Sequence, residues 1–112
     1  MKLLAACTTV ATIDDARRLA EAAVARSLAA CVHLERIDSV YRWQGVVHSE
    51  AEVRLVFKTT EAAYPALERL LRSSHPYELP AIYAVPVEHA DPAYAAWVAG
   101  AVAATPADAD ER

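Results

Sequence analysis

The sequence predicts a single α+β domain built from two joined β-α-β units and a last helix. Two observations support this class. Two kinds of segment alternate along the chain. In one kind apolar and polar residues alternate, as is typical of strands, and in the other apolar residues recur at helical spacing. The chain has 112 residues, 55% of them hydrophobic, which suffices for one core but not two. We therefore expect one domain over residues 1–104 and a polar, disordered tail over residues 105–112.

The first strand and the first helix are predicted over residues 2–10 and 16–30. Residues 2–10 form an apolar run that fits a central strand covered on both faces. Thr12, with Asp15 three residues later, is typical of a helix N-cap. The helix contains neither glycine nor proline, and one of its faces is apolar and rich in small residues. That face comprises Ala16, Leu19, Ala20, Ala23 and Val24.

A long β-hairpin is predicted over residues 31–59, where apolar and polar residues alternate. Gln44-Gly45 is the credible reversal point, so each arm has about 13 residues and reaches about 43 Å. A globule of about 100 residues is only about 33 Å across, so the tip extends beyond its own domain. A second copy is expected to cover this apolar tip, and a bulge near Ile37-Asp38 that folds the arm back is the alternative. The expected interface residues are Val40, Tyr41, Trp43, Val46 and Val47.

A second helix is predicted after the hairpin. Thr60 and Glu61 open it, and Pro65 delays its regular part to about Tyr64 because proline lacks a backbone donor. Its polar side carries charged residues. The predicted buried stripe comprises Leu67, Leu70 and Leu71.

A rigid turn over residues 75–80, a strand over residues 81–87 and a third helix complete the domain. Prolines at the ends of that strand suit an edge position in the sheet. Asp91 as N-cap and Pro92 at the first helical position begin the third helix. The element order is that of the ferredoxin-like split β-α-β arrangement with an added C-terminal helix. One side of the third helix comprises Tyr94, Trp97, Val98 and Ala101.

Charge and composition exclude several classes of function. The net charge is −4 with interleaved signs, so we expect no nucleic-acid and no membrane partner. The two glycines cannot form a phosphate-binding loop. Residues 8–15 contain no Arg or Lys, so they lack the cationic cradle of an acyl-phosphate hydrolase. No spacing marks a nucleophile elbow or a carboxylate pair, and we expect a protein without catalytic turnover.

The N-terminal segment and the cysteine content favour a cytoplasmic protein. Only six residues precede Cys7 in a Leu-Ala-Ala-Cys string, too few for a signal peptide. No apolar run reaches the roughly 18 residues of a transmembrane helix. In that compartment the two cysteines are expected to stay reduced.

A few residues are candidates for binding a ligand. Soft ions such as copper prefer thiolate and imidazole ligands, which makes Cys7, Cys31 and His75 the candidate donors. Each has a structural alternative, since strand cysteines are usually small buried apolar residues and a histidine before proline often fixes a turn. Lys58 near Glu78 in a cleft between subunits is a candidate site for a small anion.

Six motifs, in order, carry a resemblance to a known family. The chain closely resembles the CutA divalent-cation tolerance proteins over residues 3–102. This resemblance implies a ferredoxin-like homotrimer in which hairpins extend neighbouring sheets, with a role in tolerance of copper and other divalent metals and no established catalytic activity. The motifs are Cys7-Thr8, Leu28-Ala29-Ala30-Cys31-Val32, Tyr41-x-Trp43-x-Gly45, Glu52-Val53 through Lys58-Thr59, His75-Pro76-Tyr77-Glu78-x-Pro80 and Asp91-x-x-Tyr94-x-x-Trp97.

The resemblance also implies copper ligands, which are a first-strand cysteine and two adjacent histidines before a Pro-Tyr pair. Cys7 and His75 match two of these positions, whereas Ser74 stands at the third. A hydroxyl in place of an imidazole weakens a soft-metal site, so we expect weak or conditional metal binding. His33 stands where many relatives have asparagine.

The main alternative is a trimeric ligand sensor of the PII-like kind. In this interpretation a cleft between subunits holds a small anionic effector near Lys58, Tyr77 and Glu78. A bare assembly scaffold is the third interpretation.

Overall fold

The computed structural model describes residues 2–102. The predicted boundary at residue 104 and the predicted tail lie outside these residues. The described part contains four strands and three helices in the predicted order. They are β1 (Leu3–Val10), α1 (Ile13–Ala25), β2 (Cys31–Trp43), β3 (Val46–Thr60), α2 (Tyr64–Ser74), β4 (Ile82–Pro86) and α3 (Pro92–Ala101).

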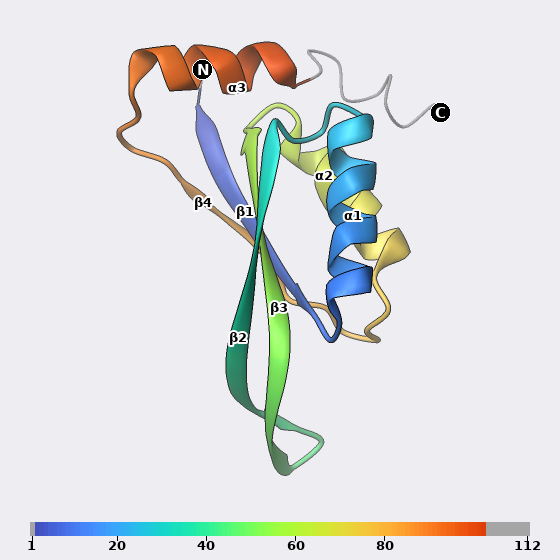
Figure 1. Ribbon diagram of the computed structural model, residues 1–112. Helices are drawn as coiled ribbons and strands as arrows, with labels where there is room; N and C mark the ends of the chain where they lie inside the picture. Colours follow the sequence, from blue (N-terminus) through green and yellow to red (C-terminus); the bar gives the residue numbers. More distant parts are fainter. Residues whose placement is uncertain (1, 103–112) are drawn as a thin grey trace.

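The four strands form one antiparallel sheet in the order β2-β3-β1-β4. β1 is central, and β4 with its terminal prolines is an edge strand, both as predicted. Helices α1 and α2 lie together on one face of the sheet, and α3 lies across the end of the sheet away from the hairpin tip (Figure 1). The ferredoxin-like prediction is therefore confirmed.

The β2-β3 hairpin extends beyond the rest of the sheet. β1 pairs with β3 only from Leu3↔Thr60 to Val10↔Val53, so residues 46–52 of β3 have β2 as their only partner in the sheet. Seven residues at about 3.3 Å each make an overhang of about 23 Å. Pairing with β2 continues without a break to Trp43↔Val46, so no bulge folds the arm back.

A two-residue turn closes the hairpin where the sequence predicts it. Gln44 and Gly45 both have positive φ angles, of 51° and 81°. Positive φ at both central residues is the condition for a type I′ turn, whose twist matches that of the flanking strands. Glycine at the second position meets this condition without steric cost.

The main core lies between the sheet and the two helices α1 and α2. Alternate residues of β3 point into it, and Phe57 and Leu55 are fully buried. The leucine stripe of α2 packs from the other side, as predicted. Its members in the core are Leu67, Leu70 and Leu71.

Helix α1 is shorter than predicted. Thr12 caps it by accepting a hydrogen bond from the Asp15 backbone N–H at 3.1 Å, but it ends at Ala25. Ser27 takes a positive φ of 57°, and the chain then enters the core as Leu28, whose carbonyl oxygen accepts a hydrogen bond from the Thr59 hydroxyl. Tertiary packing thus ends a helix that residue preferences would have continued. Of its predicted face, Val24 is exposed whereas the other four residues are buried.

Helix α3 begins as predicted, and one residue of its predicted side, Val98, is buried. The Asp91 side chain accepts a hydrogen bond from the Tyr94 backbone N–H, and Pro92 occupies the first turn. Val98 is buried in a small second cluster with Leu3, whereas Tyr94 and Trp97 are largely exposed. The predicted side of the helix is therefore only partly buried within the protomer.

Replacing Phe57 with alanine should destabilise the domain by about 3–5 kcal/mol, because a fully buried aromatic ring leaves a cavity. Urea denaturation at one fixed protein concentration measures this loss. The exposed Val24→Ala is the control and should change the unfolding free energy by less than about 0.5 kcal/mol. A loss below about 1 kcal/mol for Phe57→Ala would contradict the described core.

Candidate functional site

His75 anchors the turn that follows α2. It caps the helix in an extended backbone conformation, with Pro76 directly after it. Its Nε2 lies 3.0 Å from the Thr8 hydroxyl and 3.0 Å from the Thr9 carbonyl oxygen, and its Nδ1 accepts a hydrogen bond from the Tyr77 backbone N–H. Because Nδ1 accepts, the hydrogen-bond network assigns the proton of the neutral ring to Nε2. Both ring nitrogens are therefore engaged within the protein.

The surroundings of His75 favour its neutral form. Burial lowers the pKa of His75 below its ordinary value, and the Thr9 carbonyl and the charges of Asp15 and Glu52 oppose this only in part. A metal ion at either nitrogen would have to displace a hydrogen bond. This geometry agrees with the structural alternative for His75, in which the ring fixes a turn.

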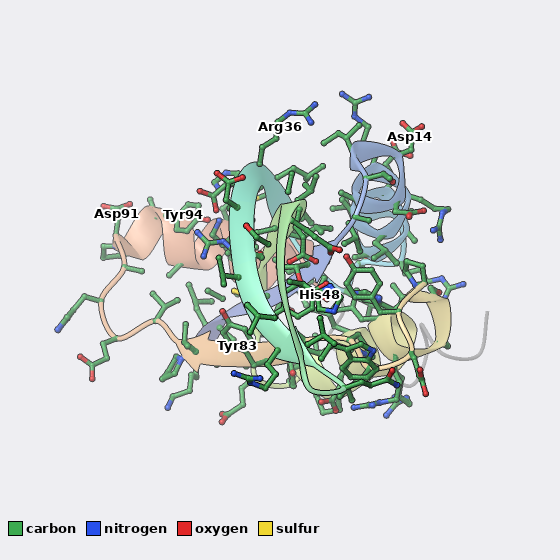
Figure 2. The ribbon with its side chains drawn as sticks, turned by 90° about the horizontal axis from the view of Figure 1, so that it is seen from below. Asp14, Arg36, His48, Tyr83, Asp91 and Tyr94 are labelled. Carbon is green, nitrogen blue, oxygen red and sulfur yellow. The ribbon has the colours of Figure 1, made fainter. Side chains whose placement is uncertain are left out.

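Cys7 lies on the opposite face of the sheet from His75. Thr8, which contacts His75, is fully buried on the face that α1 and α2 cover, and successive strand residues point to opposite faces. Cys7 instead lies opposite Tyr83 of β4, its partner in the strand register. Figure 2 shows Tyr83 on the other side of the hairpin from Asp14 of α1. One protomer thus does not bring the two predicted metal ligands together.

The described residues do not form a preformed metal-binding site. Within residues 2–102, no group of three or more His, Cys, Asp or Glu side chains is placed to hold a metal ion. Bound metals need several donors that converge within about 2.0–2.6 Å of one point. Within residues 2–102, the donors of a single protomer therefore do not converge as a metal ion would require.

A groove of about 910 Å³ lies between the hairpin overhang and the turn after α2. The Tyr77 hydroxyl bridges the two walls and donates a hydrogen bond of 2.6 Å to Oε2 of Glu52. Burial and this carboxylate raise the pKa of Tyr77 well above its ordinary value. On the hairpin, the Tyr41 hydroxyl donates to Glu50 at 2.7 Å. The lining comprises Thr9, Ala11, Asp38, Ser39, Val40, Tyr41, Trp43, Glu50, Glu52, Pro76, Tyr77, Glu78, Leu79 and Ala81.

The groove gathers some of the predicted site residues and leaves others out. Tyr77 and Glu78 line it together with two of the predicted interface aromatics. Lys58 lies six residues from Glu52 along β3, about 20 Å away. There its Nζ is 2.9 Å from Nδ1 of His33, and its strand partner is Cys31. Within one protomer, the predicted anion site is therefore split between the two ends of the sheet.

Of the carboxylates that line the groove, sequence reasoning singled out Glu78 as a candidate ligand residue but not the other three. Asp38, Glu50, Glu52 and Glu78 line it, and its described lining contains no lysine or arginine. The signal in the sequence was weak, because Glu50 and Glu52 simply occupy alternate positions of a strand. Their role depends on the turn after α2, which is distant in sequence. This lining does not favour an anionic ligand.

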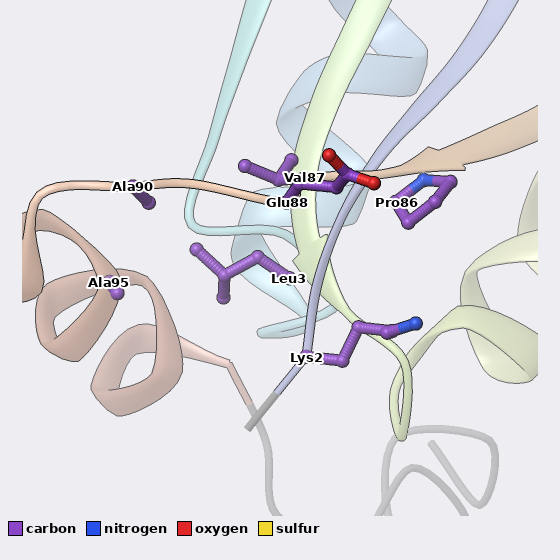
Figure 3. Close-up of a pocket in the computed structure, with 7 residues that line it drawn as sticks. All are labelled: Lys2, Leu3, Pro86, Val87, Glu88, Ala90 and Ala95. Atoms are coloured by element: carbon purple, nitrogen blue, oxygen red, sulfur yellow. The ribbon is translucent and has the colours of Figure 1, made fainter.

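A smaller pocket of about 440 Å³ lies between the start of β1, the segment after β4 and α3 (Figure 3). One lysine and one glutamate, Lys2 and Glu88, accompany apolar residues there. The two charges offset each other, so the pocket has no marked preference for a charged ligand. It contains none of the predicted site residues.

The fold and the groove define a ferredoxin-like domain with an overhanging hairpin. The family profile described as "CutA1 divalent ion tolerance protein" matches residues 4–101. The chain belongs to this family.

Curated relatives and solved structures agree with this assignment. The chain is 41% identical over 95 residues to mouse "Protein CutA", covering 84% of this chain and 54% of the mouse protein. It is 40% identical over 91 residues to the "Divalent-cation tolerance protein CutA" of Thermus thermophilus, covering 80% and 88%. The structure of CutA from Synechococcus elongatus complexed with a Bis-Tris molecule matches with a TM-score of 0.84 and 39% identity, covering 90% and 94%.

The relatives differ in length and in compartment. The chain spans about half the length of the mouse and human proteins. One relative, from rice, is named chloroplastic, and one from Archaeoglobus fulgidus is described as periplasmic. Among residues 2–102, no helix is long and apolar enough to cross a membrane.

Acidification should weaken the folded state through His75, and His75→Gln should remove part of this effect. The pKa of His75 is lower in the folded than in the unfolded chain, where it is about 6.5. As the pH falls from about 6.5 through the folded-state pKa, the unfolded chain binds the proton first, so the unfolding free energy falls.

Denaturation midpoints between about pH 7.5 and pH 5 measure this slope. The His75→Gln variant should show a shallower slope than wild type. The exposed His89→Gln is the matched control and should keep the wild-type slope. Equal slopes for wild type and His75→Gln would show that burial does not hold this ring neutral.

Proposed function

We propose that this protein serves divalent-cation tolerance as a cytoplasmic homotrimer that binds metal ions, copper among them, weakly and without catalytic turnover. Membership of the CutA1 family supports the role in tolerance. The observation that carries the assembly is the overhanging hairpin with its exposed apolar tip. An isolated protomer would leave this surface in water.

The tip exposes apolar side chains on both strands of the hairpin. Val40 is 73% exposed, Val46 56% and Val47 58%. Tyr41 and Trp43 are exposed beside them. Exposed apolar side chains gathered at one end of a protein usually mark an interaction site, and a symmetric homo-oligomer is the commonest way to bury them.

The opposite edge of the molecule offers surfaces for such an assembly. β4 is an edge strand with a free outer side, and its Tyr83 and Val85 are about half exposed. Tyr94 and Trp97 of α3 are exposed as well, and their rings lie 6.0 Å apart. Both edges of the sheet are free to accept strands of further copies. These features support a closed ring in which each copy covers the hairpin of another.

The metal-binding part of the proposal depends on Cys7. Its thiol is a soft donor on the face of the sheet that α1 and α2 leave open, although Cys7 itself is only 9% exposed. His75 cannot share a metal ion with it in the same protomer, because the two side chains lie on opposite faces. A second donor would come from another copy or from solvent, which accounts for weak binding.

A small-ligand sensor is the second candidate function. The groove of about 910 Å³ beside Tyr77 and Glu78 favours it. A relative with 39% identity is described as complexed with a small organic molecule, Bis-Tris, which supports ligand binding by this fold.

Light scattering at low micromolar concentration should give a mass of about 36 kDa, three times the 12.1 kDa of the chain. Val40→Lys should lower this mass on dilution, since a charge at the exposed tip opposes its burial. Val24→Lys makes the same change on an exposed position of α1 and should leave the mass unchanged. A stable wild-type species of 12.1 kDa would refute the proposed assembly.

Cys7→Ala should weaken soft-metal binding by about tenfold, because the thiolate is lost. His75→Gln should leave the affinity within about twofold, because both nitrogens of His75 are engaged in hydrogen bonds. Calorimetric titration with cadmium, a divalent soft ion without redox chemistry, and then with copper measures both effects. Equal affinities for wild type and Cys7→Ala would remove Cys7 as a ligand.

A further inference from the structure

The groove beside Tyr77 concentrates negative charge, although Nδ1 of His48, which is not part of the lining, lies 3.9 Å from Oε2 of Glu50. Four carboxylates line it, and its described lining contains no lysine or arginine. Glu52 is only 9% exposed, and its hydrogen-bond donor is the neutral hydroxyl of Tyr77. This bond orients the carboxylate but does not neutralise its charge. Because removing a charge from water is costly, buried carboxylates are normally paired with cations.

We propose that this groove binds an organic cation, with its ammonium group beside Glu52 and Glu50 and its apolar part against aromatic rings. The inference rests on the second proposed function, that the groove holds a small ligand, and it adds the charge of that ligand. Tyr41, Trp43 and Tyr77 supply the aromatic side chains. Their ring faces attract alkylammonium groups that lie within about 6 Å of the ring centroid.

The composition of the groove favours an organic cation over a metal ion. Within residues 2–102, no three potential metal ligands converge on one point. The volume of about 910 Å³ also exceeds by far what one ion needs. Apolar residues such as Val40 and Leu79 line the same space, and they suit the hydrocarbon part of an organic ligand.

The proposed self-assembly would place a second copy of the chain next to this groove. Tyr41 and Trp43 line the groove and also belong to the proposed interface between copies. In the assembled protein a neighbouring copy therefore borders the groove. Glu52 and Tyr77, which join the hairpin to the turn after α2, belong to one protomer. The assembled protein is thus the form in which binding has to be measured.

Choline and its uncharged carbon analogue 3,3-dimethyl-1-butanol form a matched pair of probes, because they share shape and differ in charge. Calorimetric titration into the assembled protein at low salt should show choline binding at least about tenfold tighter than the analogue. Added salt should weaken the binding of choline, because it screens the attraction of the carboxylates.

Glu52→Gln tests the proposed contact. Glutamine keeps an acceptor for the Tyr77 hydroxyl but removes the charge, so the affinity for choline should fall about tenfold. Glu78→Gln changes an exposed carboxylate of the same lining, and it provides a second test if Glu52→Gln is unstable. Glu21→Gln on the exposed side of α1 is the control and should bind choline as wild type does.

The outcomes separate this inference from the function on which it rests. Equal binding of choline and its analogue, or unchanged binding by Glu52→Gln, would overturn the proposal of a cation site but leave a ligand groove. Free glutamate, titrated in the same way, serves as an anionic probe. Binding of free glutamate without binding of choline would overturn the cation site and support an anionic effector. No binding of choline, the analogue or glutamate would overturn the ligand groove and with it the sensor function.

Discussion

The pairing of β3 with two neighbours of unequal length is the constraint on which the rest of this structure depends. β2 follows β3 to the hairpin turn, whereas β1 ends opposite Val53. The second part of β3 therefore leaves the domain as half of an isolated two-stranded ribbon. Such a ribbon is at best marginally stable in water, and its apolar tip adds to that instability. The same length difference exposes the apolar tip and forms one wall of the groove.

The turn after α2 forms the other wall, and two hydrogen-bonded side chains fix it. His75 ties the turn to β1 through Thr8 and Thr9, and Tyr77 ties it to β3 through Glu52. Neither residue needs a ligand for this role. The histidine that a comparison of motifs would assign to metal therefore has a structural task within the protomer.

The chemistry of the groove and the chemistry of the open sheet face differ in kind. The groove offers carboxylates and phenols, which are hard oxygen groups, and aromatic surface. The open face offers the thiol of Cys7 beside Tyr83, and farther along it Lys58 beside His33. Soft metals prefer sulfur and nitrogen donors, so metal binding and organic-cation binding belong to separate places on this molecule. The two proposed functions therefore do not compete for one site.

The order of the elements, the hairpin turn, the helix caps and the excess length of the hairpin follow from the amino-acid sequence alone. They depend on local periodicity and on residues such as Thr12 and Gly45. The end of α1, in contrast, depends on packing, because the chain turns at Ser27 and Leu28 enters the core. The site also depends on the tertiary structure. Cys7 and His75 lie on opposite faces of the sheet, because successive residues of β1 point to opposite faces. Neither of the two motifs shows this separation. Glu52 and Tyr77 meet because the overhang and a distant turn are brought together by the fold.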